Sequence, residues 1–320
     1  MNTVGLIAGG GQFPLLFAAR AAQRGFHVVA VAYINEADRS IQDHVAAVEW
    51  LHIGQVGRLI KFFRKNGVSQ AVMLGSVKKT RIFRDIKPDL KAVTFIASKG
   101  ITHDDGILRS FADLLEKEGI AVRPSTFLLP ELISPLGCWT KREPLRSEYR
   151  DIEVGWHMAR EIGRLDIGQC VVVANGTVLA VEGADGTDAT IERGGALAGR
   201  AGEAGFKSGG EAGFKSEGET RGKPGGGAWG KPGGTFGRKS GAVRVRAGAV
   251  AVKLAKPGQD LRFDLPASGI ETVRTMIGSG VSVLVLEADK TISFDRESMI
   301  ALADENNISI AAYNDSSFNM

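Results

Sequence analysis

The chain has 320 residues, of which 43% are hydrophobic and 24% charged, and its formal net charge is +4. This composition excludes a collagen-like, wholly disordered or disulfide-scaffold protein, and the length suits about two domains of typical size. The longest apolar runs fall far short of the roughly 18 consecutive residues that a membrane span needs. The N-terminus also lacks a basic secretory leader, so we expect a cytoplasmic protein.

Residues 1–135 show strand and helix patterns that alternate along the chain. The predicted strands are 4–8, 28–34, 71–74 and 121–123. The predicted helices are 13–24, 55–66 and 105–118. This alternation favours an α/β protein with a Rossmann-like parallel sheet. Ligands of such sheets bind beyond the carboxyl ends of the strands, so we expect a nucleotide- or phosphate-binding domain.

The first predicted strand is followed directly by Gly9-Gly10-Gly11-Gln12-Phe13-Pro14. Glycines let the backbone turn sharply and approach a ligand closely, and proline suits the first turn of a helix, whose free amides attract phosphate. The motif therefore predicts a cradle in which Gly9, Gly10, Gly11 and Gln12 bind substrate. A tight turn without a ligand is the alternative, because Pro14 replaces the third glycine of the fingerprint G-x-G-x-x-G.

Further polar residues follow the later strands of this domain. Glu36 comes just after the second strand, where it either holds a ribose hydroxyl, as in an NAD enzyme, or is a solvated loop carboxylate. Gly75 and Ser76 end the third strand and are predicted to meet the same ligand. The basic stretch 78–91 is either a site for an anionic substrate or membrane surface, or a solvated helix face.

His103, Asp104 and Asp105 open the next predicted helix. Aspartate favours the N-cap position, which accounts for Asp105 alone. His103 is a candidate donor to a phosphate or ribose, or an acid or base near neutral pH.

The pattern changes in the second half, which we predict to be an α+β catalytic domain over 151–320, joined by a linker at 136–150. Predicted strands at 171–174 and 178–182 flank Asn175-Gly176, a typical hairpin turn. The acidic stretch 182–188 follows and leads into a predicted helix at 189–197. Its side chains either hold a cation or polar ligand, or cap that helix.

A glycine-rich segment at 199–241 interrupts this domain. It contains 16 of the 42 glycines, and GEAGFKS and GKPGG each occur twice at a step of eight residues. Eight basic and four acidic residues give it a surplus of +4, so the rest of the chain is neutral. With few aliphatic side chains it cannot offset the entropy of ordering its backbone, and we predict a disordered insertion.

After the insertion, a predicted strand at 249–254 leads into the sequence KPGQDLRFDLP at 256–266. Asp260 and Asp264, bracketed by Lys256 and Arg262, have the composition of a magnesium-assisted phosphoryl site, with carboxylates on the metal and cations on the phosphate oxygens. A surface loop with neutralising ion pairs is the alternative. The remaining predicted elements are a helix at 270–278, a strand at 281–287 with its hairpin partner at 290–294, a helix at 295–305 and a strand at 308–313.

Four motifs are spaced along the chain: GLIAGGGQFPLL at 5–16, THDDGILR at 102–109, VEGADGTD at 181–188 and KPGQDLRFDLP at 256–266. Together and in this order they resemble the LpxI family of UDP-2,3-diacylglucosamine pyrophosphatases. The resemblance implies a cytoplasmic, Mg²⁺-dependent hydrolase of lipid A biosynthesis. Such enzymes split UDP-2,3-diacylglucosamine into UMP and 2,3-diacylglucosamine 1-phosphate. Peripheral contact with the inner membrane surface and formation of a homodimer are two further possibilities that the resemblance leaves open.

The resemblance also implies site residues. Besides the glycine turn and Gly75-Ser76, the substrate-binding candidates are His103, Asp104, Arg123, Asp185, Thr187 and Asp188. The resemblance further implies that one aspartate of the last motif, either Asp260 or Asp264, is essential for catalysis. The residue types of the motif add Lys256 and Arg262 as catalytic candidates, with Asp260 and Asp264 as the ligands of Mg²⁺. Asp289 stands where the family is expected to have glycine in a turn.

Two other functions stay open on the sequence alone. An NAD-dependent oxidoreductase would use the glycine turn and Glu36, but it leaves the two late aspartates without a role. A nucleic-acid binder would depend on the aromatic and basic residues of the insertion. We expect no nucleic-acid partner.

Overall fold

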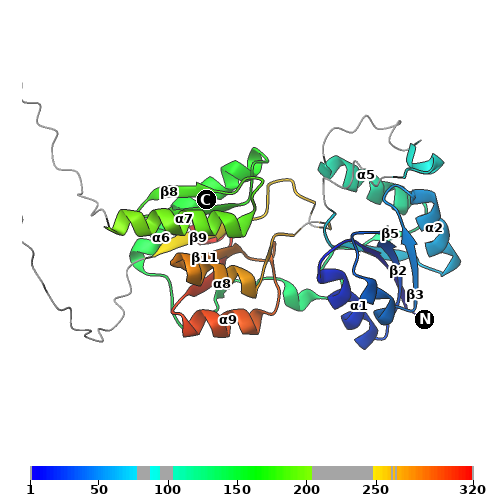
Figure 1. The fold of residues 1–320 in the computed structure, drawn as a ribbon, viewed down its shortest axis with the longest axis horizontal. Helices are drawn as coiled ribbons and strands as arrows, with labels where there is room; N and C mark the ends of the chain where they lie inside the picture. The colour runs from blue at the N-terminus through cyan, green and yellow to red at the C-terminus, as the bar shows by residue number, and fades with distance from the viewer. Residues whose placement is uncertain are drawn as a thin grey trace, which may run out of the picture.

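The computed structural model describes residues 2–77, 87–93, 104–203, 248–260, 262–263 and 265–318, with backbone alone at 104–107 and 200–203. These residues form two α/β halves that lie one beside the other along the longest axis (Figure 1). The predicted site residues His103 and Asp264, and most of the predicted insertion, lie outside the described residues.

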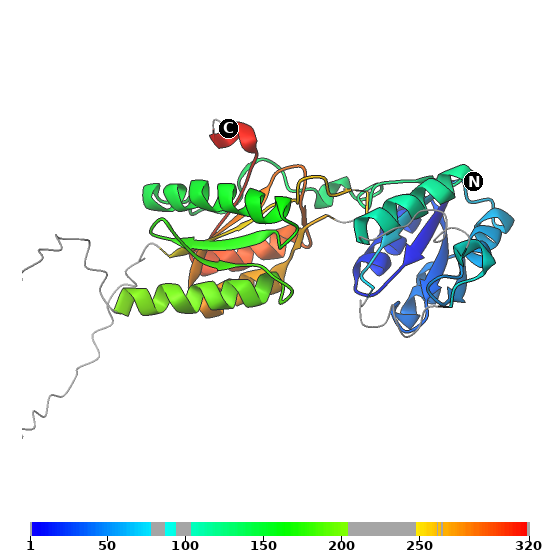
Figure 2. The ribbon, with the colours of Figure 1, turned by 90° about the horizontal axis from the view of Figure 1, so that it is seen from above.

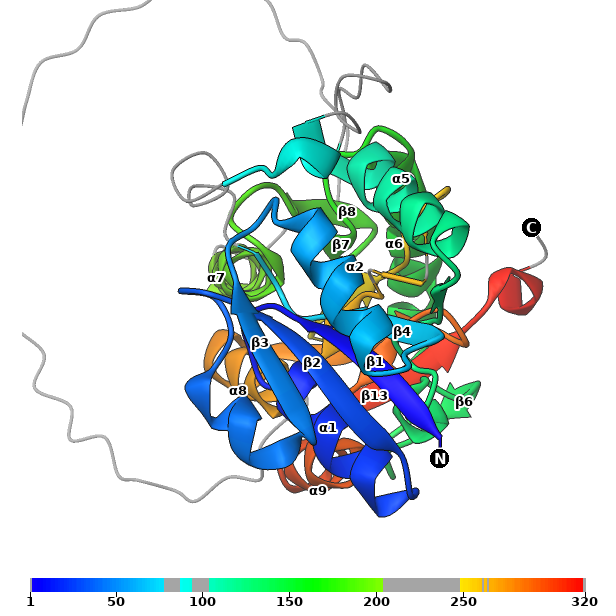
Figure 3. The same ribbon diagram turned by 90° about the vertical axis from the view of Figure 1, so that its right-hand side faces the viewer.

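The N-terminal half is built on a five-stranded parallel sheet. Its strands are β1 (Thr3–Ala8), β2 (His27–Tyr33), β3 (Ala47–Leu51), β4 (Gln70–Leu74) and β5 (Ala121–Val122), in the order β3-β2-β1-β4-β5. All four strand pairs are parallel, and Figure 3 shows β3, β2 and β1 in sequence across this half. The chain therefore leaves β1 in one direction for β2 and β3, and returns on the other side with β4.

Helices cover both faces of this sheet. The helices are α1 (Phe13–Gln23), α2 (Val56–Lys65) and α5 (Asp104–Lys117), with a 3-10 helix η1 (Arg39–His44). Successive strand residues point to opposite faces. Leu6, Ala30 and Val72 accordingly pack in one buried cluster with α1, whereas Ile7, Val31 and Met73 pack in another with α2 and α5. The predicted Rossmann-like arrangement is confirmed.

The C-terminal half contains a six-stranded mixed sheet. Its strands are β6 (Gly137–Cys138), β7 (Cys170–Ala174), β8 (Thr177–Val181), β9 (Ala249–Lys253), β11 (Val281–Glu287) and β13 (Ser309–Tyr313), in the order β6-β13-β11-β9-β7-β8. The central strands β9, β11 and β13 are parallel, and β7 is antiparallel to both β8 and β9. The predicted hairpin is confirmed, because Asn175 and Gly176 have the positive φ angles of 52° and 74° that a tight turn requires.

Four helices cover the two faces of the second sheet. They are α6 (Arg146–Arg164) on one face and α7 (Thr187–Glu203), α8 (Ile270–Ser279) and α9 (Arg296–Glu305) on the other. Seen from above in Figure 2, the sheet lies between α6 and α7. No helix among the described residues is long and apolar enough to span a bilayer.

Several elements differ from the sequence expectation. The strand β3 and the long helix α6 were not predicted, and α6 begins at Arg146, inside the segment predicted as a linker. Residues 292–293 form β12 (Ile292–Ser293), which pairs in parallel with β10 (Ala267–Ser268) and not with β11. The predicted hairpin partner of β11 is therefore wrong. Asp289 has a φ of 63°, in the left-handed region that glycine adopts most easily.

The β10–β12 pair joins the two halves. Ile292 belongs to the buried cluster around α1, and Phe294 packs edge-on against Phe13 with ring centroids 5.1 Å apart. Ile133 also forms an isolated bridge with Ile292. Residues from the C-terminal part of the chain thus complete the apolar core between α1 and the first sheet.

Candidate active site

Two loops meet at the carboxyl edge of the first sheet, between β1 and β4. The amide of Gly9 donates to Leu74 O at 2.8 Å, and Gly10 and Ser76 exchange backbone hydrogen bonds of 2.7 and 3.0 Å. Because the strand order reverses at this point, it is the position where ligands of open α/β sheets bind. The structure therefore brings the Gly9–Gln12 turn and Gly75-Ser76 together, as predicted.

The glycines of this turn have different roles. A Cβ atom at Gly9 would lie 2.6 Å from Ser76 O, and one at Gly75 would lie 2.6 Å from Gly10 O. These two glycines therefore permit the close backbone approach of the loops. Gly11 has a φ of 92°, and no atom lies within 4 Å of its ideal Cβ position. Gly11 is thus the glycine that leaves space for a ligand.

The turn leads into the N-terminus of α1. Gln12 occupies the N-cap and makes no side-chain capping hydrogen bond, while Pro14 lies within the first turn. Both Gly11 and Gln12 are exposed. The first amides of a helix and its dipole favour an anion, so this end of α1 suits a phosphate group.

Arg123 lies away from this turn. Its backbone follows β5, but its Nε donates to Gln70 Oε1 at 3.1 Å, and its guanidinium stacks 5.3 Å from the centroid of Phe127. Gln70 is the first residue of β4, whereas Gly75 follows the last one. The structure therefore places the Arg123 side chain toward the opposite end of β4 from Gly75-Ser76. Asp104 begins α5, and only its backbone is described.

The second part of the candidate site is the loop 256–263, which follows β9 and is called the catalytic loop after the role that the sequence predicts for it. Asp260 accepts hydrogen bonds from Arg262, from Nε to Oδ1 at 3.0 Å and from Nη2 to Oδ2 at 2.8 Å. Arg109 Nε lies 3.5 Å from Oδ2 of the same carboxylate. The hydrogen bonds from Arg262 hold the pKa of Asp260 below its ordinary value, and Asp260 in turn raises the pKa of Arg262.

This loop contacts the first half of the chain. Arg262 forms an ion pair with Glu116 of α5 at 3.2 Å, and Arg262 O accepts from the amide of Ser125 at 3.0 Å. Arg109, also on α5, donates from Nη2 to Gly258 O at 2.5 Å. In Figure 1 the gold segment after β9 extends from the second half toward α5. The structure therefore brings Asp260 and Arg262 to the junction of the two halves.

Lys256 lies at the base of the catalytic loop. Its Nζ pairs with Asp166 at 2.7 Å, and its amide donates to Gln259 Oε1 at 3.1 Å. The structure thus places Lys256 beside the end of α6, on the side of the loop that belongs to the second half.

A buried carboxylate anchors the start of the loop. Glu287, at the carboxyl end of β11 and 1% exposed, accepts from Arg160 at 2.8 and 3.0 Å and from the amide of Ala255 at 3.0 Å. Arg160 also pairs with Asp315, and Lys290 pairs with Glu287. A buried charge is costly when it is left unpaired, and the partners of Glu287 avoid that cost. The sequence did not predict a role for Glu287 or Arg160. The two residues are 127 positions apart, and a strand pattern gives no signal for an ion pair between distant residues.

The acidic stretch after β8 leaves the same edge of the second sheet as the catalytic loop, because β8 and β9 run in the same direction. Thr187 donates to Glu182 Oε1 at 3.1 Å, and Asp188 accepts from Thr272 at 3.3 Å. Asp185 pairs with Arg193 and accepts from the amide of Gly183 at 3.1 Å. These contacts are internal to the second half and fix the start of α7.

The described residues do not by themselves fit a magnesium ion. Both oxygens of Asp260 accept hydrogen bonds from Arg262, and a cation would have to displace that guanidinium. No group of three or more His, Cys, Asp or Glu side chains with metal-binding geometry occurs within the described part of the chain. Cys170 is also unsuited as a nucleophile or metal ligand, because burial raises the pKa of its thiol to about 12.

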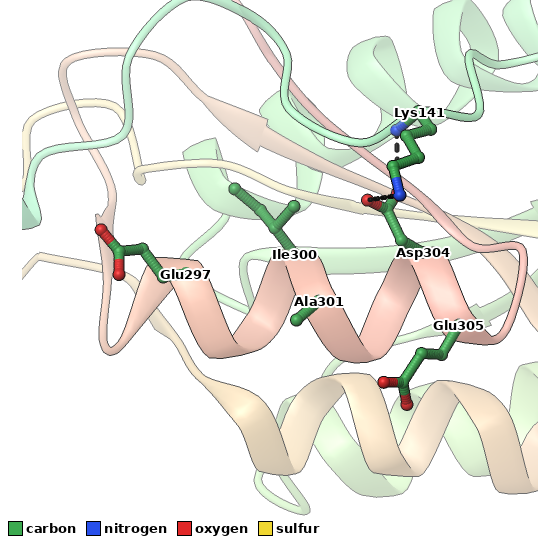
Figure 4. A pocket seen from close by; sticks show the side chains of 6 residues that line it. All are labelled: Lys141, Glu297, Ile300, Ala301, Asp304 and Glu305. Carbon is green, nitrogen blue, oxygen red and sulfur yellow. Dashed lines mark hydrogen bonds and ion pairs between the residues drawn. The ribbon is translucent and has the colours of Figure 1, made fainter.

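A separate hollow of about 540 Å³ lies along α9, lined by Lys141, Glu297, Ile300, Ala301, Asp304 and Glu305. Figure 4 shows Lys141 directed at Asp304, which accepts from its amide at 2.8 Å. Its lining contains no residue of the glycine turn or the catalytic loop.

The fold and these loops define an α/β protein of two halves, in which the first half has a strand end suited to a phosphate group and a charged loop of the second half contacts α5 of the first. The chain belongs to the LpxI family. The profile of the LpxI N-terminal domain matches residues 3–132, and that of the LpxI C-terminal domain matches 135–210 and 236–311. The resemblance stated from the four motifs is therefore confirmed, and the unmatched residues 211–235 fall within the predicted insertion.

One relative matches nearly the whole chain. UDP-2,3-diacylglucosamine pyrophosphatase LpxI of Caulobacter vibrioides is 32% identical over 314 residues, which cover 95% of each chain.

Among solved structures, a UDP-glucose-4-epimerase from Stenotrophomonas maltophila is 14% identical, covering 38% of this chain and 35% of its own, with a TM-score of 0.26. A phosphoribosylglycinamide synthetase from Anaerococcus prevotii is 12% identical, covering 58% and 40%, with a TM-score of 0.24. Both scores are too low to indicate a shared overall fold.

Proposed function

We propose that this chain hydrolyses the pyrophosphate bond of UDP-2,3-diacylglucosamine, giving UMP and 2,3-diacylglucosamine 1-phosphate in lipid A biosynthesis. The observation that carries the proposal is membership of the LpxI family through both halves of the chain, together with a relative of that activity at 32% identity. The reaction adds water across one P–O–P linkage, so one P–O bond breaks and one forms.

The glycine turn supports the nucleotide end of this reaction. The N-terminus of α1 presents amides without a side-chain cap beside the open position at Gly11. Preorganised amides of this kind bind phosphate oxygens without a second full charge. We assign the UDP portion of the substrate to this turn, with Gly11, Gln12 and Ser76 nearest to it.

The catalytic loop supplies the positive charge that hydrolysis of a diphosphate requires. A diphosphate carries several negative charges, and transfer of a phosphoryl group to water depends mainly on positioning and on neutralising those charges. Arg262 and Arg109 lie beside Asp260 at the junction of the two halves. In our proposal both guanidinium groups exchange Asp260 for phosphate oxygens when substrate binds, and this exchange frees the ionised Asp260 to bind the metal or the attacking water.

Magnesium dependence is also part of the proposal. Mg²⁺ binds substrate phosphates together with one or two carboxylates, and it would neutralise charge on the diphosphate. Asp260 and Asp264 stay the predicted ligands. Asp260 becomes available only when Arg262 moves from its carboxylate.

The direct test is release of UMP from UDP-2,3-diacylglucosamine by the purified full-length chain, with and without EDTA, followed by addition of Mg²⁺. We expect turnover that EDTA abolishes and Mg²⁺ restores. Turnover that is unaffected by EDTA would refute the metal requirement, and absence of UMP release under both conditions would refute the activity.

The proposed membrane contact and homodimer have separate tests. The substrate carries acyl chains, so we expect the chain to bind the inner membrane surface. Flotation with anionic lipid vesicles would measure this binding. Sedimentation of the purified chain would measure its oligomeric state.

A further inference from the structure

Buried charged groups of the second sheet hold the backbone on both sides of the catalytic loop. Before the loop, the amide of Ala255 donates to Glu287 Oε2 at 3.0 Å. After it, Ala267 O accepts from Lys253 Nζ at 2.5 Å. Glu287 and Lys253 are the last residues of β11 and β9, and they are 1% and 6% exposed. The two ends of the loop are therefore tied to neighbouring strands of one sheet.

The Glu287 carboxylate is held in one orientation by Arg160 of α6. Arg160 donates to both carboxylate oxygens, at 2.8 and 3.0 Å, and such paired hydrogen bonds fix the geometry of the group that accepts them. Arg160 also pairs with Asp315 of the 3-10 helix η3 (Asp315–Phe318) at 2.8 Å and lies 5.4 Å from the ring centroid of the fully buried Trp156. Two helices and a strand thus determine where the acceptor of the Ala255 amide lies.

The middle of the catalytic loop is held more weakly than its ends. Arg262 and Arg109 pair with Asp260, but their side chains are 32% and 51% exposed, and exposed ion pairs are individually weak. In the proposed function both arginines leave Asp260 for phosphate oxygens. The place of Asp260 then depends on the backbone of the loop. A displacement of about 1 Å at a reacting group can lower the rate about 100-fold.

We infer that Glu287, oriented by Arg160, is a positioning residue for Asp260. It acts through the amide of Ala255 and keeps the start of the catalytic loop in the place that hydrolysis requires, without touching the substrate. The inference rests on the proposed function, because it concerns the reaction assigned to Asp260. It gives the buried ion pair a part in turnover as well as in stability.

The test is a double-mutant cycle on kcat for release of UMP from UDP-2,3-diacylglucosamine, with Glu287→Gln, Asp260→Asn and the double variant. Glutamine keeps the size of the side chain, but its amide group would face the donors of Arg160 or Lys290. We expect Glu287→Gln to lower kcat about 10- to 100-fold in the wild-type chain. In Asp260→Asn it should lower kcat less than about 2-fold, since no carboxylate is left to position.

A merely structural role gives a different pattern in this cycle. Loss of folded protein would lower kcat by the same factor in the wild-type chain and in Asp260→Asn. Equal factors in the two backgrounds, or full turnover in Glu287→Gln, would overturn the inference.

Glu148→Gln is the matched control. Glu148 is also fully buried, and it accepts from Arg142 at 2.7 and 2.9 Å and from the amide of Leu145 at 2.7 Å. It accepts from Ser282 near the start of β11, whereas Glu287 ends that strand. We expect Glu148→Gln to lower the melting temperature and to keep the wild-type kcat below that temperature. A loss of kcat as large as in Glu287→Gln would overturn the inference.

Arg160→Lys replaces Glu287→Gln in the cycle if the glutamine variant does not fold. Lysine keeps the positive charge but cannot form the paired hydrogen bonds of a guanidinium group, so we expect the same pattern with a smaller loss of kcat. Amide hydrogen exchange gives a readout without turnover. Peptides over 254–263 should exchange faster in the variant than in the wild-type chain, while those over 47–65 stay unchanged. Unchanged exchange in the loop would overturn the inference.

Failure of the proposed function is distinguishable from failure of the inference. A wild-type chain that releases no UMP refutes the proposed function, and the inference falls with it. An active wild-type chain with full turnover in Glu287→Gln refutes the inference alone. Full turnover in Asp260→Asn together with reduced turnover in Glu287→Gln also overturns the inference, because Glu287 then does not act through Asp260.

Discussion

The glycine turn and the catalytic loop are held in place by different forces. Reciprocal backbone hydrogen bonds and a close approach of Gly9 and Gly75 fix the turn. Ion pairs among Asp260, Arg262 and Arg109 hold the loop. A backbone contact depends on shape and tolerates almost no added atom, whereas partly exposed ion pairs are individually weak and exchange readily with a charged ligand. The turn is thus preorganised, and the loop can trade its internal partners for substrate.

The largest expected effect is on turnover, from removing the charge of Asp260. Asp260→Asn keeps the shape of the side chain but leaves Arg262 and Arg109 without their anion, so we expect kcat to fall about 100- to 1,000-fold. UMP release by the variant measures it. Glu271→Gln, which removes an exposed carboxylate paired with Arg274 on α8, is the matched control and should keep full turnover. Wild-type turnover in Asp260→Asn would show that the loop carboxylate has no catalytic part.

The next effect is on stability, from adding one methyl group to the turn. Both Gly75 and Gly11 have φ near 90°, so alanine is strained at either position. Only at Gly75 would the new Cβ also meet backbone, 2.6 Å from Gly10 O. We expect Gly75→Ala to lower the free energy of unfolding by about 2–4 kcal/mol more than Gly11→Ala does. Equal losses in urea unfolding would mean that the loop contact adds nothing to stability.

A smaller effect is expected from pH acting on the catalytic loop. The folded-state pKa of Asp260 is lowered by Arg262, so its ionised form stabilises the folded state. This contribution is fully present above the unfolded pKa of about 3.9 and is lost as the pH falls through the lowered folded value. The difference in unfolding free energy between wild type and Asp260→Asn should therefore be constant from pH 7 to about pH 5 and shrink below about pH 4. A difference that grows on acidification would contradict this assignment.

The smallest effect is expected from deleting residues 211–235, which the family profiles leave unmatched. The segment lies between α7 and β9, so it precedes the start of β9, whereas the catalytic loop leaves the opposite end of that strand. We expect unchanged UMP release and a melting temperature within a few degrees of the wild type, since the cost of closing a loop changes slowly with its length. A large loss of turnover would instead assign the insertion a part in the reaction.

Local patterns in the sequence were enough to predict the scaffold of the first half. Alternating apolar runs and amphipathic segments predicted most strands and helices, and the glycines after β1 marked the strand end at which Gly10 and Ser76 meet. The same kind of signal predicted the hairpin at Asn175-Gly176. It did not predict α6, because charged residues of this helix are buried among its apolar ones. Glu148 is an example: it is buried, and its Oε1 lies 2.7 Å from Arg142 Nη2.

By itself, the sequence determined the family, the parallel sheet and the strand end at which Gly10 and Ser76 meet, because hydrophobic period, glycine turns and short motifs are local properties of the chain. Only the tertiary structure separated the packed Gly9 and Gly75 from the open Gly11 and paired β12 with β10. The tertiary structure also brought Arg109 and Ser125 into contact with the catalytic loop. Each of these depends on contacts between residues far apart in sequence, and packing of the whole chain decides which distant groups approach closely enough to interact.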